Sequence, residues 1–164
     1  MAVSLDEVDV KLLLELERDA SRSNVELARL AGLSPAATLN RVRRLKESGA
    51  IRRIGARLDS AAVGFTLQVY VTVTLARQDE AAHRRFVDTV VQTAQVISAD
   101  WVTGETDALL MIVARDVAEL QAVLTRLTIR GGAQRVITLL RLEELKPSSP
   151  LPLRPTSVQR ARGR

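Results

Sequence analysis

The sequence predicts an α+β protein in which an N-terminal winged helix-turn-helix precedes a ferredoxin-like βαββαβ domain. Two observations lead to this fold class. Before residue 49, apolar residues recur at helical spacing, and short capped segments follow one another closely. After residue 64 the spacing changes to alternation, and strands and helices follow in the order βαββαβ. The predicted domains cover residues 1–62 and 63–146, and residues 147–164 form a tail.

Two helices are predicted in the first thirty-two residues. The first covers residues 5–19, whose leucines and valines recur at helical spacing. The second begins after Ser23, which has Glu26 three positions later, as in a capping box. Gly32 ends this second helix, because glycine readily adopts the left-handed conformation found at helix C-termini.

A third helix is predicted to begin after Ser34 and to end at Gly49. Ser34 is a good N-cap, and Pro35 suits the first helical position, where a missing N–H costs nothing. Its predicted buried stripe consists of residues three positions apart, Leu39, Val42 and Leu45. Two short helices joined by a tight turn, the second with one apolar and one cationic face, indicate a helix-turn-helix.

The other side of this third helix has the side chains that reading DNA requires. Small residues let a helix approach the major groove closely, asparagine binds base edges, and arginine holds phosphates. The candidate DNA-binding residues are Ser34, Pro35, Ala36, Ala37, Asn40, Arg41, Arg43 and Arg44. The alternative is an ordinary helix with a solvated arginine face. We favour DNA binding because the caps, the turn and the charge agree.

Residues 51–58 are short, basic and interrupted by Gly55, and we expect a strand or small hairpin in the position of a wing. Arg52 and Arg53 would then lie against the DNA backbone. Residues 41–57 contain seven basic residues and one acidic residue, a density that indicates a polyanionic partner. The alternative is a linker with exposed charges.

The second half of the chain begins with a strand at residues 65–75, where β-forming apolar residues alternate with polar ones. The apolar run at residues 107–114 predicts a buried central strand. The other predicted elements are a helix at 79–93, a strand at 96–103, a helix from 116 to the glycines at 131–132, and a strand at 135–142.

The composition argues against several classes of function. The chain has 164 residues, no cysteine and one histidine, so we expect no disulfide, no metal site and no catalytic residue, and we predict that the protein is not an enzyme. No apolar run approaches the roughly 20 residues that span a bilayer, so we expect no membrane partner and a cytoplasmic protein. Four aromatic residues are too few for single-strand binding by base stacking.

The last residues, 147–164, contain four of the five prolines and four arginines, and we expect a disordered tail. Its arginines would add non-specific contacts to DNA phosphates. A terminus without a function is an equally good interpretation.

Several motifs in order resemble the Lrp/AsnC family, also called feast/famine regulators. They are LDEVD, NVELARLAGLS, LSPAATLNRVRRLKESGAI, TGETDALLMI and LEELK, and the resemblance covers residues 4–146. It implies a winged helix-turn-helix joined to the βαββαβ domain that is called RAM in this family. It also implies a transcription factor that dimerises through its RAM sheets and assembles into higher even oligomers such as octamers. Many members respond to an amino acid bound between RAM domains.

The resemblance places a candidate effector site in the second half of the chain. The residues carried over are Thr103, Gly104, Glu105, Thr106, Asp107 and Thr138. Gly104 allows close backbone approach to a ligand, and Glu105 or Asp107 suits an α-amino group. This family loop often reads Gly-Asp-Tyr-Asp, whereas here the middle residues are Glu105 and Thr106. The alternative is a plain hairpin turn.

We therefore predict a sequence-specific regulator of transcription that binds double-stranded DNA and responds to a small molecule, an amino acid by the family resemblance. No cofactor is expected. Two other functions are compatible with the sequence. One is an architectural DNA-binding protein without a ligand, and the other is an amino-acid-binding regulatory subunit, because a ferredoxin-like fold does not fix function.

Overall fold

The computed structural model describes residues 3–76 and 79–156. The chain divides into two compact units, one formed by Met1–Ala56 with Lys146–Arg164 and the other by Arg57–Leu145. Each unit has its own hydrophobic core, and the two are described separately below. Among the described residues, no helix is long and apolar enough to cross a membrane.

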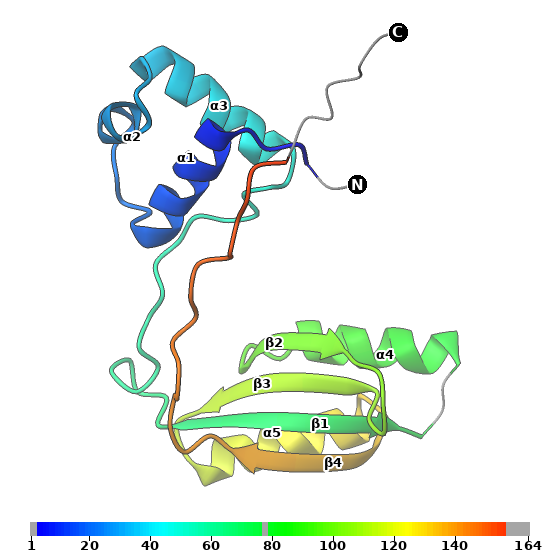
Figure 1. Ribbon diagram of the computed structural model, residues 1–164. Coiled ribbons are helices and arrows are strands. Elements are labelled where there is room, and N and C mark those ends of the chain that lie inside the picture. The colour runs from blue at the N-terminus through cyan, green and yellow to red at the C-terminus, as the bar shows by residue number, and fades with distance from the viewer. Residues whose placement is uncertain (1–2, 77–78, 157–164) are drawn as a thin grey trace, which may run out of the picture. The chain divides into compact units, whose positions relative to one another are not determined.

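The first unit contains three helices: α1 (Glu7–Arg18), α2 (Asn24–Ala31) and α3 (Pro35–Glu47) (Figure 1). Asp6 and Ser23 begin α1 and α2 with complete capping boxes, and Ser34 caps α3. The fully buried leucines Leu12 and Leu45, with Leu27, form the core between the helices. The predicted three-helix arrangement and its caps are therefore confirmed.

The buried stripe of α3 differs from the prediction. Leu39 is 58% exposed, whereas Thr38 is completely buried and packs inward together with Leu45. The Thr38 hydroxyl donates to the backbone oxygen of Ser34 at 3.1 Å, so its only polar group is satisfied within the helix. Its methyl group can then pack like that of an apolar residue. Of the three residues in the predicted stripe, Leu45 is fully buried and Val42 is half-buried, so the prediction is wrong only at Leu39.

The wing predicted at residues 51–58 is not formed. These residues have no regular secondary structure and are almost all exposed. Gly55 interrupts the segment, and none of the strands that the structure describes pairs with it to complete a hairpin ladder. Arg52 and Arg53 are therefore exposed side chains of an irregular segment.

The disordered tail predicted for residues 147–164 differs from the structure over 147–156, and residues 157–164 lie outside the described part. Leu5 and Thr156 exchange two hydrogen bonds, from Thr156 N–H to the Leu5 oxygen at 2.8 Å and from Leu5 N–H to the Thr156 hydroxyl at 3.3 Å. The Leu151 N–H donates to the Glu17 carboxylate at 3.2 Å. The segment is extended and exposed, and these bonds hold it along α1.

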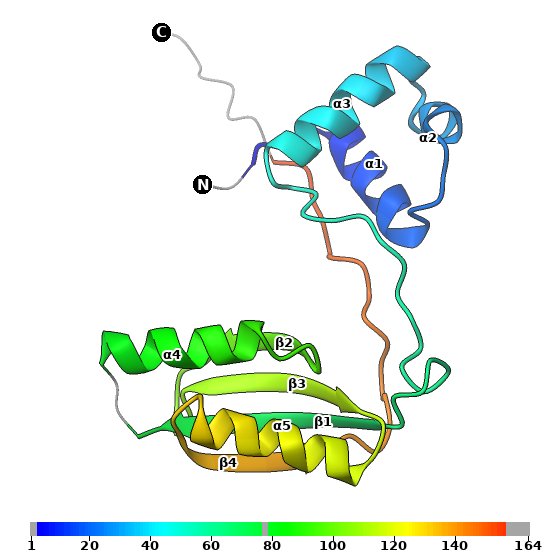
Figure 2. The same cartoon turned by 180° about the vertical axis from the view of Figure 1, so that it is seen from behind.

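The second unit is a four-stranded antiparallel sheet with two helices. Its strands are β1 (Leu67–Leu75), β2 (Val96–Trp101), β3 (Ala108–Ala114) and β4 (Ala133–Leu140), in the spatial order β2-β3-β1-β4. Its helices are α4 (Glu80–Val91) and α5 (Val117–Ile129). This is the predicted βαββαβ topology, and both helices cover the same face of the sheet (Figure 2).

The core of this unit lies between the sheet and its helices. Alternate residues of β1, Val69, Val71 and Val73, are buried there against Phe86 of α4 and Leu127 of α5. No helix of the described residues lies on the other face of the sheet. Its residues, which follow from the strand register, include Tyr70, Thr72, Leu109, Met111, Ile137 and Leu139. Within one chain, each of these residues is half-buried or exposed.

Candidate functional site

The turn between α2 and α3 fixes how α3 is presented. Gly32 ends α2 with a φ of 70°, in the left-handed region that glycine adopts without strain. The side-chain amide of Asn24 donates to the backbone oxygen of Pro35 at 2.7 Å, which ties the start of α2 to the start of α3. Ser34 accepts from the Ala37 N–H at 3.2 Å. The start of α3 is thus held from two sides.

One face of α3 is exposed. Ala36, Asn40 and Arg43 follow one another at helical spacing, and all three side chains are in solvent. Arg43 donates to the side-chain oxygen of Asn40 at 3.0 Å, so the guanidinium and the amide lie together. A small residue followed by an amide and a guanidinium fits the major groove, where these groups bind base edges and phosphates.

Two other arginines of α3 form ion pairs with carboxylates of the same unit. Arg41 pairs with Asp6 at 2.6 Å and with Asp9 at 2.9 Å, and Arg44 pairs with Asp9 at 2.5 Å. The Asp9 side chain is 1% exposed, so its charge depends on these partners. The hydrogen bond from Arg41 lowers the pKa of Asp6, and the same bond raises the pKa of Arg41. Both arginines, predicted to hold phosphates, join α3 to α1.

The predicted effector loop connects β2 to β3. Gly104 has a φ of 123°, a conformation that a side chain would strain. Asp107 donates its N–H to the Val73 oxygen at 2.9 Å, and its carboxylate accepts from the Leu75 N–H at 2.7 Å. Asp107 therefore fixes the loop to the end of β1, while Glu105 is exposed at its tip.

Thr138 does not lie in that loop. It is an exposed residue of β4, paired in register with Val71, whose other neighbour is Leu110 of β3. The strands β3 and β4 lie on opposite sides of β1, about 10 Å apart by the usual strand spacing. Within one chain, the candidate effector residues are therefore not all together. Residues 103–107 lie in the loop, and Thr138 lies on the other side of β1.

A small apolar pocket adjoins this loop. It has a volume of about 210 Å³ and lies between α4 and the edge strand β2. Trp101 and Ala108, the residues on either side of the loop, both line it, together with Phe86 and Val90. The Trp101 ring lies 4.9 Å from the His83 ring and 5.6 Å from the Phe86 ring, centre to centre.

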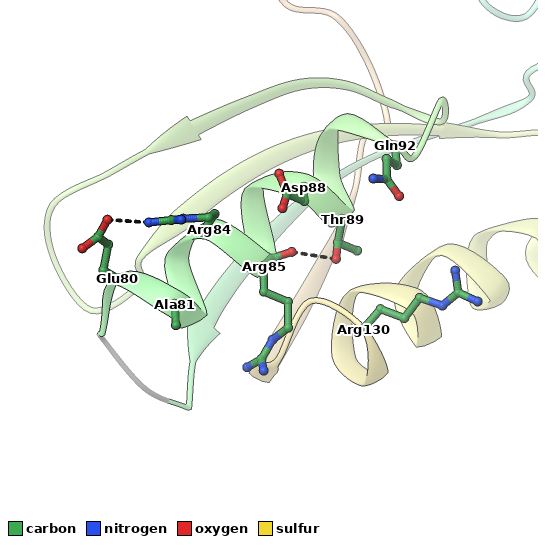
Figure 3. Close-up of a pocket in the computed structure, with 8 residues that line it drawn as sticks. All are labelled: Glu80, Ala81, Arg84, Arg85, Asp88, Thr89, Gln92 and Arg130. Carbon is green, nitrogen blue, oxygen red and sulfur yellow. Dashed lines mark hydrogen bonds and ion pairs between the residues drawn. The ribbon is translucent and has the colours of Figure 1, made fainter.

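A wider and shallower pocket of about 630 Å³ lies between α4 and the end of α5. Its lining is mainly charged, and Arg84 is already paired with Glu80 at 2.6 Å (Figure 3). The side chains of Arg85 and Arg130 point in different directions in this view and do not converge on one point. In the described part of the chain, no group of acidic or histidine side chains could hold a metal ion.

Comparison with known proteins assigns both units. A family model of the AsnC-type helix-turn-helix domain matches residues 5–46, and a model of the Lrp/AsnC ligand binding domain matches residues 68–151. The chain belongs to the Lrp/AsnC family. Lrp/AsnC proteins are transcriptional regulators, so the helix-turn-helix is a DNA-binding domain and the sheet unit is a ligand-binding domain.

Several Lrp/AsnC relatives match over nearly their whole length. The leucine-responsive regulatory protein of Rhizobium meliloti is 37% identical over 88% of this chain and 93% of its own. The Bkd operon transcriptional regulator of Pseudomonas aeruginosa is 37% identical over 91% of this chain and 98% of its own. A transcriptional regulator from Neisseria meningitidis, solved as an L-Met complex, superposes with a TM-score of 0.84. It is 32% identical and covers 91% of this chain and 97% of its own.

The structure separates the predicted DNA-binding residues of this Lrp/AsnC protein into four groups, one of which is Arg52 and Arg53 in the irregular segment after α3. Ser34, Pro35 and Ala37 belong to the first turn of α3. Ala36, Asn40 and Arg43 form the exposed face, and Arg41 and Arg44 are paired with α1. Sequence reasoning missed Leu39, which is exposed beside that face. The sequence does hold an indication that Leu39 is exposed. Its neighbour Thr38 has a methyl group and can take the inward position in its place.

Proposed function

We propose that this protein binds specific sites on double-stranded DNA by placing α3 in the major groove. One observation carries this proposal: Ala36, Asn40 and Arg43 share an exposed face on a helix whose start is fixed by Asn24. Asparagine pairs with adenine through two hydrogen bonds, and arginine holds guanine or phosphate. Asn40 would specify bases and Arg43 would bind either a base or the backbone.

Phosphate contacts would come from exposed arginines that are not paired with α1. Arg52 and Arg53 follow α3 in an irregular segment, and both are in solvent. Their charges are available to phosphates, which position a protein on DNA without reading its sequence. Arg41 and Arg44 would contribute indirectly, by holding α3 against α1.

We further propose a homodimer formed through the open face of the sheet, and a higher even oligomer such as an octamer built from dimers. Support comes from Leu139 and Ile137, which are 50% and 38% exposed on a face that no helix covers in the described chain. An apolar face of this kind is costly to leave in water. A dimer would place two copies of α3 about 34 Å apart on DNA, so the binding site would be a pseudo-palindrome.

The effector is proposed to be an amino acid bound at the loop of residues 103–107, with Thr138 supplied across the sheet or by another copy. The relative solved with L-Met supports this ligand class. The pocket beside Trp101 supports the location, because it offers an apolar surface next to the polar loop. Ligand binding would change DNA affinity, and linkage requires DNA to change ligand affinity by the same factor. Such a regulator would act in the cytoplasm.

The test is binding of the purified protein to the DNA upstream of its own gene and to a scrambled version. Each measurement is made at two salt concentrations, with and without the twenty amino acids. Selective binding that the amino acids change supports the whole proposal. Selective binding without that change contradicts amino-acid sensing alone. Binding that is weak, salt-sensitive and unselective would indicate an architectural protein, and no binding would contradict the DNA-binding function.

The chain offers its own probe for the effector. Trp101 is the only tryptophan and lines the small pocket beside the loop. We expect its fluorescence to change when the right amino acid is added, and we expect Glu105→Gln to weaken that response. A fluorescence spectrum unmoved by every amino acid would contradict an effector at this loop.

A further inference from the structure

Leu39 is the exposed apolar residue of the recognition helix. Its side chain is 58% exposed, whereas α1 and α2 leave none of their leucines exposed and bury Leu12, Leu13 and Leu27. The inward position is taken by Thr38, which is completely buried. Leu39 therefore contributes little to the core, and its side chain is available to a partner.

The residues around Leu39 on α3 indicate the kind of partner that its side chain would contact. Leu39 lies three residues after Ala36 and four before Arg43, so it borders the exposed face proposed to enter the major groove. Ala36 leaves space beside it, and Arg43 and Lys46 supply positive charge on the same side. The surface around Leu39 is therefore small and cationic, which suits DNA and does not suit a second apolar protein face.

DNA has one apolar group that a side chain can reach in the major groove, the C5-methyl group of thymine. We propose that Leu39 contacts a thymine methyl group and makes the protein prefer thymine at one position in each half-site. This inference rests on the proposed DNA-binding function and adds a specificity-determining residue to it. Its neighbour Asn40 would read a hydrogen-bonding edge, and Leu39 would read a methyl group.

The test removes that methyl group and nothing else. Each thymine of the bound upstream site is replaced in turn by deoxyuridine, which pairs identically and lacks only the C5-methyl. We expect the parent protein to lose about fourfold in affinity at one position of each half-site, the value of one buried methyl group. Leu39→Ala should lose a similar factor on ordinary DNA and should no longer respond to deoxyuridine.

Two control variants make the result specific. Leu39→Met keeps a long apolar side chain and should keep the deoxyuridine response. Val117→Ala shortens another exposed apolar residue, which is 70% exposed at the start of α5, and should bind like the parent. Because Leu39 lies outside the core, circular dichroism should show that Leu39→Ala keeps its helices.

The possible failures are distinguishable. If the parent binds the upstream site selectively but tolerates deoxyuridine at every position, this inference is wrong and the proposed function stands. If Leu39→Ala keeps the parent's deoxyuridine response, the methyl contact belongs to another residue and the inference is again wrong. If the parent shows no selective binding, the proposed function fails, and this inference fails with it.

Discussion

Arg41 of the recognition helix donates a hydrogen bond to a carboxylate oxygen of Asp9, 32 residues earlier in the chain, at 2.9 Å. The Asp9 side chain is 1% exposed, so this ion pair is one of the links between α1 and α3. Arg44 binds the other oxygen of the same carboxylate at 2.5 Å. Part of the cationic surface of α3 thus holds the domain together, and the part proposed to contact DNA, with Arg43, stays exposed.

Removing Arg41 should destabilise the helix-turn-helix unit. Arg41→Ala leaves the buried Asp9 carboxylate with Arg44 as its remaining cation, so we expect a loss smaller than the roughly 3–5 kcal/mol that an uncompensated buried charge costs. Amide hydrogen exchange of α1, compared between variant and parent, measures this loss in the unit itself. Arg43→Ala is the matched control, because Arg43 is exposed and donates its hydrogen bond to Asn40, a neighbour on the same helix, and not to α1. It should leave exchange unchanged.

A double-mutant experiment can show whether the loss of stability in Arg41→Ala comes from the charge interaction with Asp9 or from lost packing. Asp9→Asn neutralises the buried charge, so adding it to Arg41→Ala should cost less than the sum of the two single changes. Strict additivity in hydrogen exchange would contradict a direct charge interaction between the two residues.

Acid should weaken the same contact through Asp6. Its hydrogen bond with Arg41 lowers the pKa of Asp6 below the ordinary value of 3.8. The folded state therefore binds this proton less tightly than the unfolded state, and the contribution to stability is complete above about pH 4 and lost as the pH falls through the folded pKa. We expect Asp6→Asn, which retains a capping side chain, to unfold at lower denaturant concentration than the parent at pH 7. The two midpoints should converge as the pH falls through the lowered pKa of Asp6, and a gap that stays constant would contradict this origin.

Asp107 should stabilise the loop between β2 and β3. Its carboxylate accepts from the N–H of Leu75, a residue that is buried, so Asp107→Ala leaves that N–H without this acceptor. A buried donor left unpaired costs about 1–3 kcal/mol. Denaturant unfolding followed by Trp101 fluorescence reports on this unit. Glu105→Ala, at the exposed tip of the same loop, should change the free energy of unfolding by less than about 0.5 kcal/mol.

The open sheet face should be required for dimerisation. Leu139→Asp places a charge opposite Tyr70 on that face, where a dimer would have to bury it. We expect sedimentation to show monomers, and DNA affinity to fall because two recognition helices no longer act together. Val117→Asp adds the same charge at the first turn of α5 and should leave the oligomer unchanged. A Leu139→Asp variant that remains oligomeric would contradict dimerisation through this face of the sheet.

Much of this fold could be predicted because its signals are local. Ser23 with Glu26, and Ser34 with Pro35, mark helix starts within four residues, and the structure confirms them. The alternation along β1 likewise depends only on neighbouring residues and correctly predicts which valines are buried. These features follow from backbone chemistry that does not depend on the rest of the chain.

The errors arose where hydrogen bonds, ion pairs or strand partners that apolar periodicity does not count decide the outcome. The pairing of Arg41 with Asp9 joins positions that no sequence period relates, so both arginines of that cluster looked available to phosphates. Thr38 replaced Leu39 in the core because its hydroxyl is satisfied by Ser34, which a scale of apolar residues does not count. The hairpin predicted at residues 51–58 failed because a strand requires a partner as well as a suitable sequence.

The most direct test of the central claim is the DNA affinity of Asn40→Ala and Arg43→Ala on the protein's own upstream site, with circular dichroism to confirm the fold. Both residues are exposed on α3, so both variants should fold like the parent. Asn40→Ala should cost about 1–3 kcal/mol on the specific site and little on scrambled DNA. Arg43→Ala should weaken binding and, if it contacts phosphate, lower the salt slope by about 1. Parent-like affinity for both variants would contradict the assignment of this face to DNA.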